Sequence, residues 1–318
     1  HIAHVLRRHL PENFEQAVGI LLDSVDAPHG EDIGGSMAAF LFLPHTALVA
    51  HYGLAHFEAS MRAQHALTQR FTAEFSIRPF LMQHEAATLM RLRQWTQDPS
   101  EHVRRLVSEG TRPRLPWAPR LPAFQKDPTP VLALLELLKD DPALYVRRSV
   151  ANNLNDIGKD HPEVLTGTTY QWLQNASEER QWIVRHALRT AIKRGEPGAL
   201  AVLGFGAQAD VAVRGTQITP PRAAIGEKVV LAFEVVNRST APQRVLVDCQ
   251  IHYTKANGST AAKVFKLKTL ELQAGETARL QKTVSLAQMS TRTHYPGRHR
   301  VDALLNGHAE PLGHFDLN

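Results

Sequence analysis

The sequence predicts a two-part, α plus β protein: an N-terminal all-α HEAT-like repeat solenoid followed by an all-β immunoglobulin-like sandwich. Three observations predict it. Apolar residues recur at helical spacing through residues 1–206, one motif in that stretch occurs three times, and from residue 207 short alternating runs separated by turns begin. A chain of 318 residues is long enough for two domains, which we place at 1–206 and 207–318.

Helical periodicity is clear around the apolar positions Leu67, Phe71 and Phe75. These positions predict one long helix over 57–80, which Pro79 should end or kink because proline lacks the amide hydrogen that a helix needs. A further helix is predicted over 85–95. Trp95 and Trp172 are interpreted as core residues.

The repeated motif places a valine before two basic residues. Its copies occupy residues 102–107, 145–150 and 182–187, at spacings of 43 and 38 residues, and Asp-Pro precedes the first two. This period, with two helices per unit, is typical of HEAT-like repeats. We expect the aspartate to cap the second helix of each unit, the proline to lie in its first turn, and the valine to pack inward.

Stacked units of this kind align their second helices along one groove. Glu109 aligns with Asn152, and Asp156 lies one helical turn beyond Asn152, so both acids should face that groove. Each acid lies near the C-terminal end of its helix, where a negative charge opposes the helix dipole. That placement indicates a role other than helix stability. The alternative is a set of surface salt bridges of little consequence.

Trp117 lies in a proline-rich stretch, residues 113–122, which should form a stiff and extended loop. An indole held there could stack on a base or a cation. The alternative is an apolar plug that caps the groove. Trp182 begins the third copy of the motif beside Arg185 and could reach the same groove.

Charge is distributed unevenly along the chain. Residues 1–206 hold 22 Lys and Arg against 22 Asp and Glu, whereas residues 207–318 hold 14 against 9. Within 104–148, however, nine basic residues face five acids. A basic band on a neutral domain suits a polyanion. The alternative is a solvated charged face.

Other features of the sequence exclude several classes of protein. No run of about 18 apolar residues occurs, so no membrane-spanning helix is expected. The only cysteine is Cys249, which excludes an intrachain disulfide and fits a reducing compartment. The 17 histidines lack zinc-site spacing, so we expect neither a metal nor another cofactor. Because the first residue is His1, we expect native residues to precede it.

The second part should be built from about seven short strands. Alternating runs predict strands over 228–237, 244–254, 262–272, 277–286, 298–306 and 312–317, with turns such as Asn257-Gly258 between them. Strands of this number and length within about 110 residues indicate an immunoglobulin-like sandwich.

Several of these segments resemble one known family. Residues 103–117 and 145–156 closely resemble the AlkC branch of the AlkC/AlkD DNA alkylation-repair glycosylases, and residues 57–80 and 180–193 match it too. The resemblance covers nearly the whole chain, and AlkC members can carry a C-terminal Ig-like domain. It implies a HEAT-like solenoid that holds double-stranded DNA in a basic groove.

The resemblance also implies an activity. The protein would be a monofunctional glycosylase that removes cationic alkylated bases, such as 3-methyladenine and 3-methylcytosine, without flipping them into a deep pocket, and that leaves an abasic site. We expect a monomeric, cytoplasmic bacterial enzyme that acts at the nucleoid. The alternative is a non-enzymatic HEAT and Ig-like scaffold that binds damaged DNA or protein.

Roles for single residues follow from the same resemblance. Glu109, Asp156 and Glu74 would be the catalytic acids, and Trp117 and Trp182 would contact the lesion. His186 stands where the AlkD branch has a second tryptophan near the lesion. The DNA-binding set would be Arg104, Arg105, Arg112, Arg114, Arg147, Arg148, Arg185, His186 and Arg189.

Overall fold

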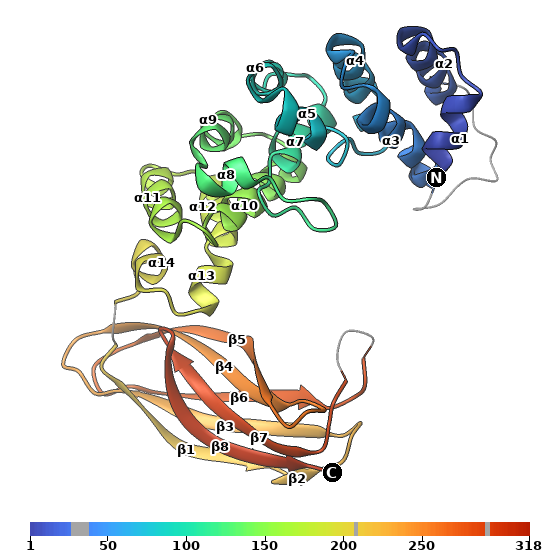
Figure 1. Ribbon diagram of the computed structural model, residues 1–318. Coiled ribbons are helices and arrows are strands. Elements are labelled where there is room, and N and C mark those ends of the chain that lie inside the picture. The colour runs from blue at the N-terminus through green and yellow to red at the C-terminus, as the bar shows by residue number, and fades with distance from the viewer. Residues whose placement is uncertain (27–37, 207–208, 290–292) are drawn as a thin grey trace. The chain divides into compact units, whose positions relative to one another are not determined.

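The computed structural model describes residues 1–26, 38–206, 209–289 and 293–318. These residues form two compact units, His1–Leu188 and Arg189–Asn318 (Figure 1). The first unit is helical, and the second contains a β-sandwich, so the predicted order of a helical part and a β part is confirmed. None of the helices in the described ranges is long and apolar enough to cross a membrane.

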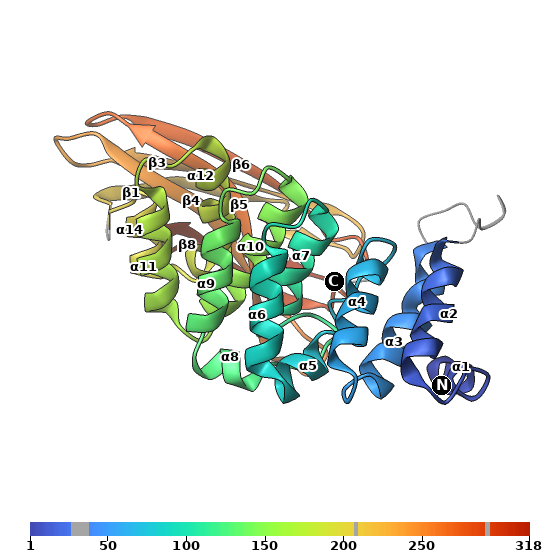
Figure 2. The same cartoon turned by 90° about the horizontal axis from the view of Figure 1, so that it is seen from above.

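The first unit is a stack of short helices. Figure 2 shows α6, α9 and α11 in one row and α7, α10 and α12 in a second row packed against it. In chain order the helices are α1 Ile2–Arg8, α2 Phe14–Asp26, the 3-10 helix η2 Ala38–Phe42, α3 Leu43–Tyr52, α4 Phe57–Thr68, α5 Arg78–Gln83, α6 Glu85–Trp95, α7 Glu101–Gly110, α8 Pro122–Lys126, α9 Thr129–Leu138, α10 Leu144–Ile157, α11 Pro162–Leu173 and α12 Glu178–Ala187.

The repeated motif builds the row of α7, α10 and α12. Val103 and Val146, on α7 and α10, are completely buried, and so is Val184 on α12. Each buried valine stabilises the stack by about 1.5–3 kcal/mol through loss of apolar surface to water. The valines therefore pack inward as predicted, and Trp95 and Trp172 are core residues as predicted.

The predicted capping of these helices needs correction. Asp98 and Asp141 do not cap α7 and α10 directly. Each accepts the backbone N–H of the residue two positions later, at 2.8 and 2.9 Å, and that residue is the N-cap. The intervening prolines precede the helices because these Asp turns form before the first helical residue.

The predicted long helix over 57–80 is wrong. Helix α4 ends at Thr68, and α5 begins at Arg78 with Pro79 in its first turn, where proline costs no hydrogen bond. In between, the Thr72 hydroxyl accepts the backbone N–H of Glu74 at 3.3 Å, a local contact that competes with helix. The prediction of a helix over 85–95 is confirmed by α6.

The second unit combines two short helices with two sheets. The sheets have the strand orders β1-β3-β6 and β2-β8-β7-β4-β5, and neighbours are antiparallel except for β2 and β8. Their elements are α13 Arg189–Lys193, α14 Pro197–Val202, β1 Val211–Thr219, β2 Arg222–Ala223, β3 Lys228–Asn237, β4 Gln243–Thr254, β5 Thr260–Leu272, β6 Thr277–Ser285, β7 Gly297–Leu305 and β8 His308–Leu317.

All six predicted strands are present, as β3 to β8. Strand β3 shows why alternation predicted them, because its residues from Val229 to Val235 alternate between fully and partly buried positions. The sequence analysis missed β1 and β2. In β1 the alternation breaks at a bulge, where Gly215 has a φ of +60°.

Candidate active site

Acidic and basic side chains alternate in a continuous chain across the C-terminal ends of α7 and α10. Its members, in order of contact, are Glu74, Arg105, Glu109, Arg112, Asp156 and Lys159. The chain brings together all three acids that the sequence analysis named as catalytic. They come from the α4–α5 connection, the last turn of α7 and the last turn of α10.

Glu109 occupies the centre of this chain. Its side chain is buried, and its Oε1 accepts a hydrogen bond from Arg112 Nη1 at 2.6 Å. Its Oε2 accepts a hydrogen bond from the hydroxyl of Ser149, on α10, also at 2.6 Å. Arg105 Nη2 lies 3.6 Å from Oε1. Both oxygens of this carboxylate are therefore held, one by Arg112 just after α7 and the other by Ser149 on α10.

Asp156 is the more deeply buried acid, with 1% of its side chain exposed. Its Oδ2 accepts from Arg112 Nε at 2.8 Å, and its Oδ1 accepts from Lys159 Nζ at 2.7 Å. Arg112 thus bridges Glu109 and Asp156. Burial alone would lower the pKa of the Arg112 guanidinium, but the charges of Glu109 and Asp156 outweigh it and hold that pKa above its usual value.

Glu74 joins the network through Arg105. Its Oε2 lies 2.5 Å from Arg105 Nη1 and accepts the Thr72 hydroxyl at 2.8 Å. The Arg105 guanidinium also lies 5.1 Å from the centre of the Tyr145 ring, a cation–π geometry. Arg105 therefore connects two of the three acids and is itself held from α10.

Arg78, at the start of α5, holds the main chain that carries the network between α7 and Arg112. It is completely buried and donates to the main-chain oxygens of Gly110 and Arg112 at 3.0 and 2.9 Å. Its Nε donates to the main-chain oxygen of Pro119 at 2.9 Å. Burial, together with the charge of Arg112, lowers the pKa of Arg78 to about 10, so it remains charged at neutral pH.

Trp117 projects from a loop that is fixed at its base. The indole is 98% exposed, which is incompatible with the alternative of an apolar plug. Leu115 and Leu121, at either side of it, are buried. Trp117 has a φ of +64°, a conformation that costs a non-glycine residue about 1–2 kcal/mol. Backbone conformations of this cost cluster at functional sites, and here one presents a large apolar side chain to water.

A short turn after α10 connects this loop to Asp156. Lys159 contacts Asp156, and the next residue, Asp160, accepts two hydrogen bonds from Arg114 in the Trp117 loop, one of them from Nε at 2.8 Å. The Arg114 hydrogen bonds lower the pKa of Asp160 despite its partial burial. The turn therefore fixes the position of the Trp117 loop relative to α10.

Two arginines of the predicted DNA-binding set bind the Asp-Pro turn before α10, Arg104 from the neighbouring repeat and Arg147 from the same repeat. Arg104 donates to both carboxylate oxygens of Asp141, at 2.6 and 3.0 Å. Arg147 donates to the main-chain oxygens of Asp141 and Pro142, at 2.8 and 2.7 Å. In the first two copies of the motif, the first arginine therefore donates to the Asp-Pro turn just before its own helix.

The remaining predicted residues lie on α10, α12 and α13. Arg148 and Arg185 are exposed. The Trp182 and His186 rings stack on α12 with centroids 4.9 Å apart, and His186 Nε2 lies 3.2 Å from Asn152 Oδ1 on α10. Arg189 begins α13, in the second unit, and is half-buried.

The sequence analysis missed three members of the site: Arg78, Ser149 and Lys159. Two of them carry a signal in the sequence. Ser149 places a polar residue where the other copies of the motif have Leu106 and Ala187, in a buried column. Lys159 follows Asp156 at i+3, a spacing at which side chains meet on a helical turn. Arg78 carries no such signal.

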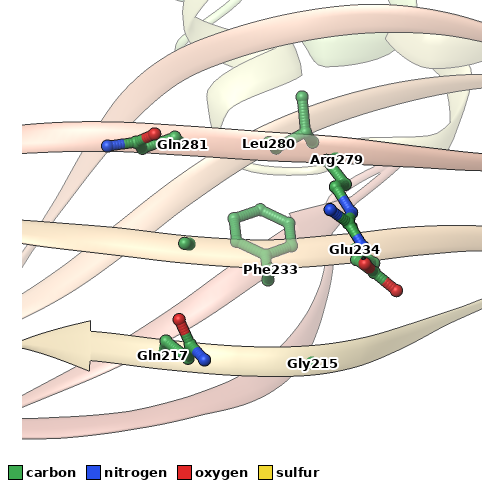
Figure 3. Close-up of a pocket in the computed structure, with 8 residues that line it drawn as sticks. Gly215, Gln217, Phe233, Glu234, Arg279, Leu280 and Gln281 are labelled. Carbon is green, nitrogen blue, oxygen red and sulfur yellow. Dashed lines mark hydrogen bonds and ion pairs between the residues drawn. The ribbon is translucent and has the colours of Figure 1, made fainter.

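A hollow on the second unit lacks the cluster of acids that marks the candidate site on the first unit. It has a volume of about 440 Å³ and is lined by Gly215, Gln217, Ala232, Phe233, Glu234, Arg279, Leu280 and Gln281. Figure 3 shows these side chains on the neighbouring strands β1, β3 and β6. Its one acid, Glu234, pairs with the exposed Arg279 at 2.7 Å. Within the described residues, no group of three or more His, Cys, Asp or Glu could hold a metal ion.

Three comparisons with known proteins bear on this site. Residues 212–318 match the family model described as the C-terminal Ig-like domain of the uncharacterised protein YhaZ, which confirms the predicted class of the β part. The chain is 39% identical over 298 residues to the uncharacterised protein YhaZ of Bacillus subtilis strain 168, covering 94% of this chain and 80% of that protein. It also matches the structure of the Pseudomonas fluorescens alkylpurine DNA glycosylase AlkC bound to DNA containing an abasic site analog. That match has a TM-score of 0.89 and 40% identity, and covers 97% of this chain and 84% of the other.

Proposed function

Because this chain belongs to the AlkC family of DNA-repair glycosylases with a C-terminal Ig-like domain, we propose that it hydrolyses the N-glycosidic bond of cationic alkylated bases in double-stranded DNA. The observation that carries the proposal is the convergence of Glu74, Glu109 and Asp156 in one cluster, together with an exposed Trp117 on the loop that Arg114 ties to the turn after α10. We propose 3-methyladenine and 3-methylcytosine as the bases released, and an abasic site as the product.

The chemistry of this reaction suits carboxylates. An N3-alkylated base already carries a positive charge, so it leaves as a neutral molecule and needs no strong general acid. The enzyme must instead place negative charge beside the sugar as it becomes an oxocarbenium ion, and must orient a water molecule. In our proposal Glu109 and Asp156 perform these two tasks and Glu74 assists. No Schiff-base lysine takes part, so the enzyme is monofunctional.

Arg112 has a different role in this proposal from the one the sequence suggested. A DNA-binding arginine needs an accessible guanidinium, whereas that of Arg112 is buried between Glu109 and Asp156. We assign it to positioning these two acids. The exposed Arg148 and Arg185 remain the better candidates for phosphate contacts, which would make DNA affinity dependent on salt.

Trp117 would meet the lesion at the protein surface. An indole face favours a cationic sugar or base by about 0.5–2 kcal/mol. Ion pairs occupy the region between the ends of α7 and α10, and both acids there are buried. This packing favours a mechanism that leaves the base near its stack over one that flips it into a deep pocket. The expectations of a monomeric, cytoplasmic enzyme acting at the nucleoid remain predictions.

Incubation of the full chain with N-methylated duplex DNA tests the proposal. Released bases are separated by chromatography, and abasic sites are measured by alkaline cleavage of the strand. We expect free 3-methyladenine and an equal number of abasic sites, with no protein–DNA adduct after borohydride treatment. The scaffold alternative predicts binding of the methylated duplex without base release, and that result over a range of salt concentrations would overturn the proposed activity.

A further inference from the structure

Asp156 is placed where it cannot meet a substrate without a change in its surroundings. Its side chain is 1% exposed, and each of its oxygens is paired with a cation, Arg112 or Lys159. A carboxylate oxygen can accept more than one contact, but a side chain that is only 1% exposed offers no open face to an oxocarbenium ion or a water. One of these two cations must therefore leave before Asp156 can act as proposed.

The two cations differ in how easily they can leave. Arg112 is 8% exposed, also pairs with Glu109, and has its main-chain oxygen held by Arg78. Its departure would leave two buried carboxylates without their shared partner, which is strongly unfavourable. Lys159 lies just after the end of α10, and its side chain, which pairs with Asp156, is 33% exposed. Its flexible stem can carry the ammonium into water at small cost.

We propose that Lys159 is a specificity-determining positioning residue, whose ammonium occupies Asp156 Oδ1 in the free protein and is displaced by the cationic nucleotide. The proposal rests on the proposed glycosylase function of this site. Replacement of one cation by another keeps the charge at Asp156 balanced. A neutral nucleotide offers no such exchange, so Lys159 stays on Asp156 when it binds. Lys159 therefore competes with a cationic nucleotide alone, and so sets how strongly the protein prefers a cationic nucleotide over a neutral one.

Binding of two abasic-site analogues separates this role from a structural one. One duplex carries a cationic pyrrolidine at the abasic position and the other carries a neutral tetrahydrofuran, and the readout is the ratio of their affinities for the full chain. Loss of any lysine weakens binding to both duplexes, so the ratio cancels that effect. In Lys159→Met the competing ammonium is gone, so the cationic analogue should gain. We expect the ratio to rise about two- to fivefold, the range for one partly exposed ion pair.

Control variants complete the test. Lys159→Gln should behave like Lys159→Met, and Lys159→Arg should restore the wild-type ratio. Lys139→Met, which removes a half-buried lysine paired with Glu136, should leave the ratio unchanged. A ratio that is unchanged or lower in both Lys159→Met and Lys159→Gln, in protein that still releases 3-methyladenine, would overturn the role of Lys159 alone. A wild-type protein that releases no base and binds the two duplexes equally would overturn the glycosylase proposal and this inference with it.

Discussion

Removal of Arg112 is the sharpest test of how the acidic cluster is held together. In Arg112→Met the buried Glu109 and Asp156 lose the cation that contacts them at 2.6 and 2.8 Å. Loss of one partner of a buried ion pair costs about 3–5 kcal/mol. Asp156 keeps Lys159, and Glu109 keeps Ser149, so we expect the lower end of this range, about 3 kcal/mol of unfolding free energy.

Urea unfolding followed by tryptophan fluorescence measures this loss. All four tryptophans lie in residues 1–188, so the signal reports the first unit alone. Arg91→Met, which breaks an exposed pair with Glu58, should cost less than about 1 kcal/mol. If Arg112→Met and Arg91→Met cost the same, the bridging role assigned to Arg112 is wrong.

Three further predictions concern other parts of the chain. Trp117→Gly should change the unfolding free energy by less than about 1 kcal/mol, because the indole is exposed and the residue has a positive φ. The affinity for the cationic abasic duplex should fall about three- to thirtyfold. A large loss of stability would contradict this prediction. Asp248→Asn should stabilise the second unit at pH 7, because burial raises the pKa of this carboxyl. The folded state then holds the Asp248 proton to higher pH than the unfolded state does. The cost of the ionised carboxylate to wild-type stability is therefore full above the raised pKa and vanishes below the pKa of the unfolded state. Calorimetry should show that Asp248→Asn is more stable than wild type at pH 7 and that this difference disappears on acidification, and a difference independent of pH would refute the prediction. Residues 207–318 hold 14 Lys and Arg against 9 Asp and Glu, so the Ig-like unit is expected to contact DNA. Changing Lys263, Lys266 and Lys268 on β5 to Gln should lower the salt dependence of binding by about one unit of slope for each phosphate that the protein no longer neutralises, and an unchanged slope would exclude β5 from the interface.

The sequence was most informative where one local pattern determines the structure. Strict alternation placed β3 at residues 228–237, and repeat alignment placed the buried Val103 and Val146 on equivalent helices. Local patterns failed to predict the structure where a bulge or a contact with a distant residue determines the backbone conformation. The Gly215 bulge hid β1 by breaking its alternation, and the spacing of Leu67, Phe71 and Phe75 continued through a segment where the chain leaves the helix.

The candidate site shows the same division. Glu109 and Asp156 could be named from their positions in the repeat and from the family resemblance. The role of Arg112 could not, because it follows the end of α7, where the repeat alignment stops. Only the packing of α7 against α10 brings its guanidinium between two acids that are 47 residues apart in sequence. A count of basic residues treats such a buried arginine and an exposed one, such as Arg148, alike.

The central claim is that Glu109 and Asp156 carry out base excision. Single-turnover release of 3-methyladenine from methylated duplex DNA tests it most directly, with DNA affinity and thermal stability measured on the same samples. Glu109→Gln and Asp156→Asn should each bind DNA, remain folded and release base about 10²–10³-fold more slowly, because each removes preorganised negative charge from the cationic transition state. Glu163→Gln, which alters an exposed acid on α11, should react at the wild-type rate. Wild-type rates in both Glu109→Gln and Asp156→Asn would contradict the account.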